Sequence, residues 1–478
     1  MKTLLIYPPG YQLLDENNGY YRNLPLGLAY LSSYLKSKNK DCRILDLNMK
    51  MFKSMQKTNK LLWRTDNRFF WERKDFFEKK VLPLIDMEKW ADYILSFKYD
   101  IIGFHMSYSS EHFSVAIAKI IKEKNKKIKI IFGGPNCFHE NAKNYSSVAD
   151  AIVIGEGEIT LNELIENNFK LCKGAYVNGV WGGDREIIKD LDSLPFPDFD
   201  DVIEDYKPLW GKDYGWISVS WVRGCNGACH FCYDRKYWRG ARMRSAKNIV
   251  SEIEFQMKKY KVCNFNRGDS TLTISVKILN EICDLIIKKK ININWYTQAR
   301  PDNYLTPALL KKMRKAGCRG LSYGVESGSQ KILNSLGKGY LIKNVEKVIK
   351  NTHDAGISCF ISLMVNEPSE NLFDYLKTII FLIKNRKYIE YYSVSAAGLI
   401  PTSDWVREPN KYGFNITKTI EKDGYYYYDK PNQKYGELKR RFLEKIKPYL
   451  KTQYDYINSD EIDKNETKNS DFSSNTCL

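Results

Sequence analysis

The sequence predicts an α/β protein, because short apolar strands alternate with amphipathic helices in two separate stretches of the chain. In the first stretch, residues 1–190, the strands run into glycine turns, which favours a doubly wound parallel sheet. The second stretch, residues 216–400, repeats the alternation six times, and three closely spaced cysteines follow its first strand. Residues 191–215 between them are punctuated by proline and aspartate, which is typical of a linker.

The first stretch is expected to hold strands at 3–7, 42–47, 100–104, 128–132 and 151–154, with helices at 26–38 and 113–124. Ligands on doubly wound sheets bind at the turns that follow the carboxyl ends of the strands. Those turns here are Pro8–Gly10, Ser107–Ser109, Gly133–Pro135 and Gly155–Gly157. Neither a G-x-G-x-x-G run nor a P-loop is present, so the turns do not indicate a dinucleotide or ATP.

An insertion rich in aromatic and basic residues interrupts this first stretch at about residues 50–98. Two interpretations stay open. Amphipathic helices could pack against the edge of the domain, or the segment could form a lid over a ligand, since long insertions in compact domains are often functional.

The three clustered cysteines, Cys225, Cys229 and Cys232, have C-x3-C-x2-C spacing. Such a loop can bind neighbouring irons of one iron–sulfur cluster. Because it supplies only three thiolates, one iron of a [4Fe–4S] cluster would remain open to an exogenous ligand. A zinc site is the alternative, but zinc usually takes four paired ligands and no second pair follows, although His230 is near.

The residues around these thiols resemble the radical S-adenosylmethionine (SAM) enzymes, in which an aromatic residue precedes the third cysteine and a strand precedes the loop. Further matching segments are Arg239–Glu254, Trp295–Asp302, Met313–Gly317 and Cys318–Gln330. The expected strands fit the partial (β/α)6 TIM-type barrel of that family: 216–222, 262–266, 292–299, 319–325, 357–364 and 390–397. The resemblance implies that the open iron binds SAM, and that its reductive cleavage gives a 5′-deoxyadenosyl radical that abstracts hydrogen.

Carried over by position, the resemblance implies SAM contacts from Tyr233, Asp269, Arg300, Glu326 and Ser327. Tyr233 would lie near the adenine, and Arg300 would orient a carboxylate with its planar fork. A structural ion pair across the barrel mouth is the alternative for Arg300 and Glu326. Relatives often carry an acidic pair after the second barrel strand, and only Asp269 keeps a carboxylate there. After the fifth strand, residues 365–370 replace a glycine-containing turn that is common in the family.

The first stretch resembles the cobalamin (B12)-binding domain that precedes the barrel in one large subfamily of radical SAM enzymes. The resemblance rests on residues 23–31, Asp46 and the turns after the strands. It implies cobalamin contacts from the following turn residues: Pro8, Gly10, Ser107, Gly133, Gly134, Pro135, Gly155, Glu156 and Gly157. The D-x-H-x-x-G motif that supplies a lower cobalt ligand is absent. His105 departs from the small polar residue usual at its position, and both a buried structural histidine and an approach to the cofactor stay open.

The composition agrees with a cytoplasmic enzyme. The chain of 478 residues has eleven cysteines, no signal-like apolar segment at its start and no run long enough to span a membrane. The net charge of +18 is spread over expected helix faces, so we expect no nucleic-acid partner. Residues 401–455 should form a small C-terminal region with a helix at 434–450, and residues 456–478 a disordered tail.

These observations together predict a radical SAM enzyme with a [4Fe–4S] cluster, SAM and cobalamin, served by an electron donor of the flavodoxin or ferredoxin type. Its expected reaction is methylation of an unactivated carbon of a small molecule or peptide in natural-product or peptide biosynthesis, although the sequence identifies no catalytic residue. Two alternatives remain. One is a radical rearrangement or cyclisation with cobalamin structural or absent; the other is an RNA-binding or regulatory protein that senses cobalamin, which the intact cysteine motif disfavours.

Overall fold

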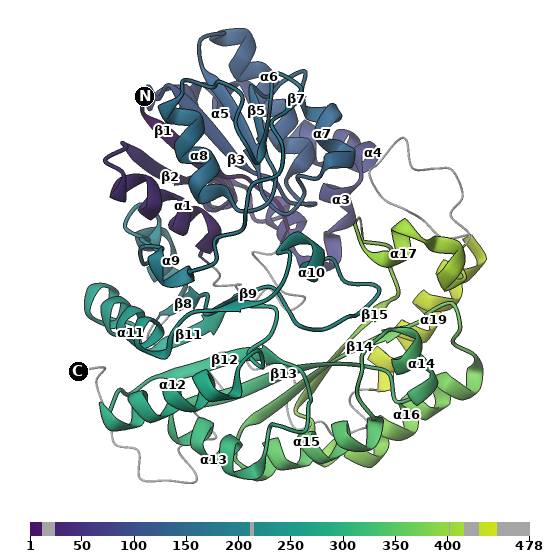
Figure 1. The fold of residues 1–478 in the computed structure, drawn as a ribbon. Helices are drawn as coiled ribbons and strands as arrows, with labels where there is room; N and C mark the ends of the chain where they lie inside the picture. The colour runs from purple at the N-terminus through teal and green to yellow at the C-terminus, as the bar shows by residue number, and fades with distance from the viewer. Residues whose placement is uncertain (12–23, 211–214, 401, 415–429, 447–478) are drawn as a thin grey trace. The chain divides into compact units, whose positions relative to one another are not determined.

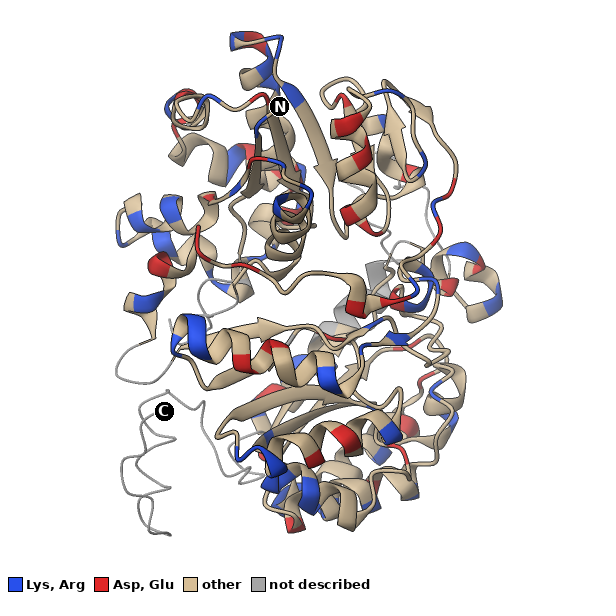
Figure 2. Ribbon diagram, turned by 60° about the vertical axis from the view of Figure 1, so that its left-hand side comes forward, with Lys and Arg blue, Asp and Glu red and all other residues tan. Residues whose placement is uncertain are grey.

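The computed structural model describes residues 1–11, 24–210, 215–400, 402–414 and 430–446. The chain divides into two compact units, Met1–Lys212 and Asp213–Leu478. No helix in the described ranges is long and apolar enough to cross a membrane. Lys and Arg residues are interleaved with Asp and Glu on the helices and loops of both units, in agreement with the dispersed charge expected from the sequence (Figure 2).

The first unit is built on a seven-stranded sheet with the order β2-β1-β3-β4-β5-β6-β7. The strands are β1 (Thr3–Tyr7), β2 (Cys42–Asp46), β3 (Ile101–His105), β4 (Lys129–Gly133), β5 (Ala151–Val153), β6 (Ala175–Val177) and β7 (Val180–Trp181). Strands β1 to β5 are parallel, which confirms the predicted doubly wound sheet. The sequence did not predict the antiparallel edge formed by β6 and β7.

The longer helices of this unit are α1 (Leu26–Ser37), α2 (Leu47–Ser54), α5 (Met87–Leu95), α6 (Glu111–Lys124), α7 (His139–Tyr145) and α8 (Gly157–Glu166). Helix α1 packs with α8, and α5 packs with α6 (Figure 1). From β1 the chain crosses to β2 on one side and then returns to β3 on the other. Crossovers between parallel strands are right-handed. A helix in a crossover toward β2 and a helix in a crossover toward β3 therefore cover opposite faces of the sheet.

The insertion between β2 and β3 consists mainly of short helical turns that pack within the first unit. Trp63 and Trp71 are fully buried there. The Trp63 indole donates a hydrogen bond to Asn48 Oδ1 at 2.7 Å, and the Trp71 indole donates to the Leu62 carbonyl at 2.8 Å. These contacts support the packing interpretation of the insertion.

The second unit is built on six parallel strands that follow chain order across the sheet, β8-β11-β12-β13-β14-β15. They are β8 (Trp216–Val219), β11 (Asn264–Arg267), β12 (Asn294–Ala299), β13 (Cys318–Glu326), β14 (Ser358–Val365) and β15 (Tyr391–Ala396). The helices that follow them include α11 (Ala246–Tyr260), α12 (Val276–Lys288), α13 (Pro307–Lys315), α14 (Gln330–Ser335), α15 (Ile342–Asp354) and α16 (Leu372–Asn385). The predicted (β/α)6 partial barrel is therefore confirmed (Figure 1).

The first barrel strand is shorter than predicted, because it ends at Val219 rather than at residue 222. The chain turns there, and β9 (Val222–Arg223) pairs antiparallel with β10 (Arg242–Met243) in a separate ribbon. The carboxylate of Asp269 stabilises this turn by accepting the backbone N–H groups of Trp221 and Val222 at 3.0 and 3.2 Å. The cysteine loop begins immediately after β9.

The C-terminal region packs on the barrel through α17 (Asp404–Arg407) and α19 (Lys430–Ile446). Helix α19 begins before the predicted residue 434, and its predicted end at 450 lies outside the described residues, as does the predicted tail. The hydroxyls of Tyr375 and Tyr392 donate to the Lys439 and Leu443 carbonyls of α19 at 3.0 and 2.7 Å.

Candidate functional site

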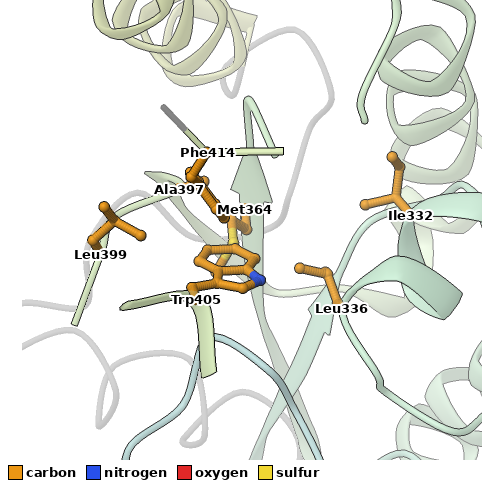
Figure 3. Close-up of a cluster of buried hydrophobic side chains, with 7 residues drawn as sticks. All are labelled: Ile332, Leu336, Met364, Ala397, Leu399, Trp405 and Phe414. Carbon is orange, nitrogen blue, oxygen red and sulfur yellow. The ribbon is translucent and has the colours of Figure 1, made fainter. Parts of the chain in front are cut away.

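The cysteine loop is fixed to the barrel by backbone hydrogen bonds and by an aromatic anchor. His230 N donates to the Leu336 carbonyl at 3.0 Å, and Trp405 N donates to the His230 carbonyl at 3.3 Å. Phe231 packs against a buried cluster formed by Ile332, Leu336, Met364, Ala397, Leu399, Trp405 and Phe414 (Figure 3). The aromatic residue before the third cysteine therefore holds the loop against the core.

Glycines allow the loop to fold closely. Gly224 has φ +81°, and a Cβ there would lie 2.0 Å from the Gly240 carbonyl oxygen. A Cβ at Gly227 would lie 2.5 Å from Arg300 Nη1. A larger residue at Gly224 would collide with the backbone, whereas one at Gly227 would have to displace the Arg300 guanidinium.

The three loop thiols differ from the other cysteines in accessibility. Among the described cysteines, only Cys225, Cys229 and Cys232 are partly exposed, and the rest are buried. The Gly227 N–H donates to Cys225 Sγ at 3.2 Å. Burial raises the pKa of Cys225, and it raises the pKa of Cys232 to about 12, so iron binding would have to displace these protons.

The sequence left a cluster and a single metal ion as the two possible ligands of these thiols. Within the described ranges, no three His, Cys, Asp or Glu side chains are grouped closely enough to hold one metal ion. A cubane cluster does not require that convergence, because each thiolate binds a different iron. His230 Nδ1 lies 2.9 Å from the Ser335 carbonyl oxygen, so this ring nitrogen has a protein partner.

Arg300, at the carboxyl end of β12, lies beside the cysteine loop. Its Nε donates to Asp302 Oδ2 at 3.2 Å, and its Nη2 donates to the Lys338 carbonyl. Its Nη1 is 3.9 Å from Cys229 Sγ. The guanidinium thus places positive charge next to a candidate cluster ligand, where it would favour a bound anion.

Glu326, at the end of β13, forms a buried ion pair with Lys338 at 3.1 Å. The two side chains are 10% and 7% exposed. Burial alone would lower the pKa of Lys338, but the Glu326 carboxylate reverses the effect and the pKa is raised. Arg300 and Glu326 are therefore in separate ion pairs and do not pair with each other.

Sequence reasoning missed Lys338, although a signal was present. It lies between Gly337 and Gly339, which both have positive φ (+69° and +72°), and a lysine held between two glycines marks a constrained turn.

The remaining predicted SAM residues have protein partners. Asp269 also accepts from the Ser220 hydroxyl at 2.9 Å, so its carboxylate positions the turn before the cysteine loop. The Ser327 hydroxyl lies 3.1 Å from that of Thr378, inside the barrel wall. Tyr233 precedes α10 (Asp234–Tyr237), and burial raises its pKa. Their contacts with SAM stay predictions.

A cavity of about 370 Å³ opens beside the Arg300–Asp302 pair. Its lining includes Asp302, Asn303, Tyr304, Gln330, Asn334, Tyr340 and Asn344. Amide and phenol groups of this kind suit a hydrogen-bonding ligand. The sequence did not predict this cavity.

In the first unit, the predicted turns gather along the carboxyl edge of the sheet. A Cβ at Gly10 would lie 2.5 Å from Ser109 Oγ, and a Cβ at Gly134 (φ +136°) would lie 2.5 Å from the Met106 carbonyl oxygen. The turns after β1, β3 and β4 therefore pack closely, and they carry Pro8, Ser107, Gly133 and Pro135. Glycine at these positions permits the close approach.

The turn after β5 is arranged differently. Gly155 has φ +81° and open space around it, and Gly157 begins α8. The Glu156 carboxylate accepts the Ile188 N–H at 2.9 Å, which ties the turn to the segment after β7. Contacts of these nine turn residues with cobalamin stay predictions.

Tyr7 and His105 are the last residues of β1 and β3, at the carboxyl edge of the sheet, and their ring centroids lie 5.5 Å apart. Burial lowers the pKa of His105 to about 4, so its imidazole is neutral at pH 7. Behind them, Asp46 accepts the Tyr206 hydroxyl at 2.7 Å, and burial raises the pKa of Asp46 to about 6. An uncharged imidazole at this edge suits a metal-containing ligand such as a corrinoid.

Two family models match this chain: the radical SAM superfamily over residues 219–413 and the B12 binding domain over residues 75–165. An uncharacterised methyltransferase of Pyrococcus horikoshii is 26% identical over 402 residues, which cover 80% of this chain and 78% of that protein. The anaerobic magnesium-protoporphyrin IX monomethyl ester cyclase of Rubrivivax gelatinosus is 29% identical over 298 residues, or 58% of this chain and 54% of the cyclase.

The solved structure of the cobalamin-dependent SAM radical enzyme OxsB, with aqua-cobalamin and SAM bound, has a similar fold. The TM-score is 0.70 with 16% identity, over 93% of this chain and 66% of OxsB. At 16% sequence identity, this similarity establishes the fold alone.

Proposed function

Because the chain belongs to the radical SAM enzymes that carry a B12-binding domain, we propose that it is a cobalamin-dependent methyltransferase. Its acceptor would be an unactivated carbon of a small molecule or peptide. When bound, the cluster supplies the electron that cleaves SAM, and cobalamin carries the methyl group that is transferred.

The observation that carries the proposal is the set of three partly exposed thiols in a loop fixed to the barrel. Cys225, Cys229 and Cys232 would hold the cluster. Arg300 would bind the carboxylate of SAM next to the cluster, because its guanidinium lies 3.9 Å from Cys229 Sγ and is oriented by Asp302. The cavity beside this pair would take a hydrogen-bonding part of SAM or of the acceptor.

The test measures 5′-deoxyadenosine formed from SAM by the anaerobically reconstituted protein with a chemical reductant. A Cys229→Ala variant should lose this activity. The matched control Cys263→Ala, which removes a buried thiol from the same unit, should retain it. Equal activity of wild type and the Cys229 variant would refute the assignment of the cluster.

The similarity to the cyclase supports a second candidate, a radical cyclisation or rearrangement without methyl transfer. Product mass separates the two, because methylation adds about 14 Da whereas isomerisation adds nothing; in both, a cofactor carries the radical step. We also propose that a flavodoxin- or ferredoxin-type protein supplies the electron in the cell.

A further inference from the structure

The strand order of the first unit reverses direction between β1 and β3. From β1 the chain crosses to β2 on one side, and then to β3 on the other, as the order β2-β1-β3 shows (Figure 1). In open α/β sheets, ligands bind at such a reversal, outside the carboxyl ends of the two strands. Tyr7 and His105 are the last residues of these two strands.

His105 differs from the other histidines in the contacts of its side chain within the described residues. The chain has five histidines. Ring nitrogens of His112, His139 and His230 lie 2.9 to 3.1 Å from a Glu72, Tyr176 or Ser335 oxygen, and His353 lies 3.6 Å from Asp354. In the described part of the chain, no hydrogen bond or ion pair to the His105 imidazole is found, and Tyr7 provides its ring contact.

The backbone around His105 is nevertheless well held. Its carbonyl accepts the Ser110 hydroxyl at 3.1 Å, and Met106 N donates to the Gly133 carbonyl at 2.8 Å. His105 as a residue is half-buried, at the carboxyl end of β3. An imidazole with a fixed backbone and an unused nitrogen lone pair is pre-organised to bind a metal.

We infer that His105 binds the cobalt of a bound corrinoid on the corrin face that lies against this sheet. The inference rests on the proposed function and names a residue within its cobalamin site. Imidazole is a favourable ligand for first-row metals of this kind. The turn after β1 reads Tyr7-Pro8-Pro9-Gly10-Tyr11, so it offers no competing imidazole.

Electron paramagnetic resonance of the Co(II) state tests the assignment directly. The full chain is loaded with cobinamide, which lacks the nucleotide base that could itself bind cobalt, and is then reduced. A nitrogen ligand from the protein should split the cobalt lines into triplets. Protein grown with ¹⁵N-histidine should give doublets instead, and this comparison needs no substitution that could disturb folding.

The His105→Ala variant should lose the splitting, whereas the control His139→Ala should keep it, because His139 is exposed and bonded to Tyr176. Bound cobinamide with unsplit lines would overturn the inference and leave the proposed function standing. Triplets that persist with ¹⁵N-histidine or in His105→Ala would assign the ligand elsewhere and overturn it too. Failure of the protein to retain cobinamide or cobalamin would overturn both the inference and cobalamin-based methyl transfer.

Discussion

Substituting Asp269 separates a role in positioning the cysteine loop from a role in binding SAM. The carboxylate is buried and accepts hydrogen bonds from Ser220 Oγ, Trp221 N and Val222 N, at 2.9, 3.0 and 3.2 Å. Asp269→Asn keeps the shape but replaces one acceptor oxygen with a donor. We expect the variant to lose one or two of the three bonds.

A hydrogen bond to a charged group contributes about 1.5–3 kcal/mol, so the expected loss of unfolding free energy is about 2–5 kcal/mol. Urea unfolding of the apoprotein measures it. Asp284→Asn is the matched control, because Asp284 is 63% exposed and its ion pair with Lys312 should contribute at most about 1 kcal/mol.

The positioning role also predicts that Asp269→Asn incorporates less iron on reconstitution than the control does. The reasoning is refuted if Asp269→Asn unfolds like wild type and binds a full cluster but has lost affinity for SAM. That result would show that the main role of Asp269 is to bind SAM and not to position the cysteine loop.

Three further predictions test other parts of the structure. Phe231→Ala should lower the unfolding free energy by about 2 kcal/mol, because Phe231 is half-buried, and should lower iron content, whereas Phe231→Leu should retain both. Lys338→Met should cost about 3–5 kcal/mol by leaving Glu326 buried without its partner, and the double variant with Glu326→Gln should regain part of this in urea unfolding. The raised pKa of Asp46, about 6, means that the folded protein holds this proton more tightly than the unfolded chain, so stability falls as pH rises from about 4 to 6. Asp46→Asn should therefore be more stable than wild type at pH 7, by at most about 3 kcal/mol, and equal to it near pH 4; equal stability at both pH values would contradict the burial argument.

The alternation of strands and helices was sufficient to predict the parallel sheet of the first unit, because its buried strands read as short apolar runs such as Ile101–His105. For the second unit, the same alternation was combined with the family resemblance to predict a partial barrel. The hairpin of β6 and β7 was missed, although Asn178 and Gly179, with φ of +48° and +81°, form the asparagine–glycine turn that favours such hairpins. These strands are too short to show a period of their own.

The candidate site was predictable in the cysteine loop and less so around it. Spacing alone was enough to nominate Cys225, Cys229 and Cys232 as cluster ligands, because the pattern is local in sequence, and the structure shows them partly exposed; their binding of iron stays a prediction. The partners of Asp269 and Glu326 were not predictable, because the three-dimensional packing decides them. Asp269 bonds a turn 47 to 49 residues away, and Glu326 pairs with a lysine twelve residues on.

Cofactor content after anaerobic reconstitution with iron, sulfide and hydroxocobalamin tests the central claim most directly. The account predicts about four irons per chain, as in one cubane cluster, together with stoichiometric cobalt, and loss of the iron in Cys225/Cys229/Cys232→Ala. Iron without cobalt would contradict cobalamin-dependent methyl transfer, and cobalt without iron would contradict the radical SAM chemistry.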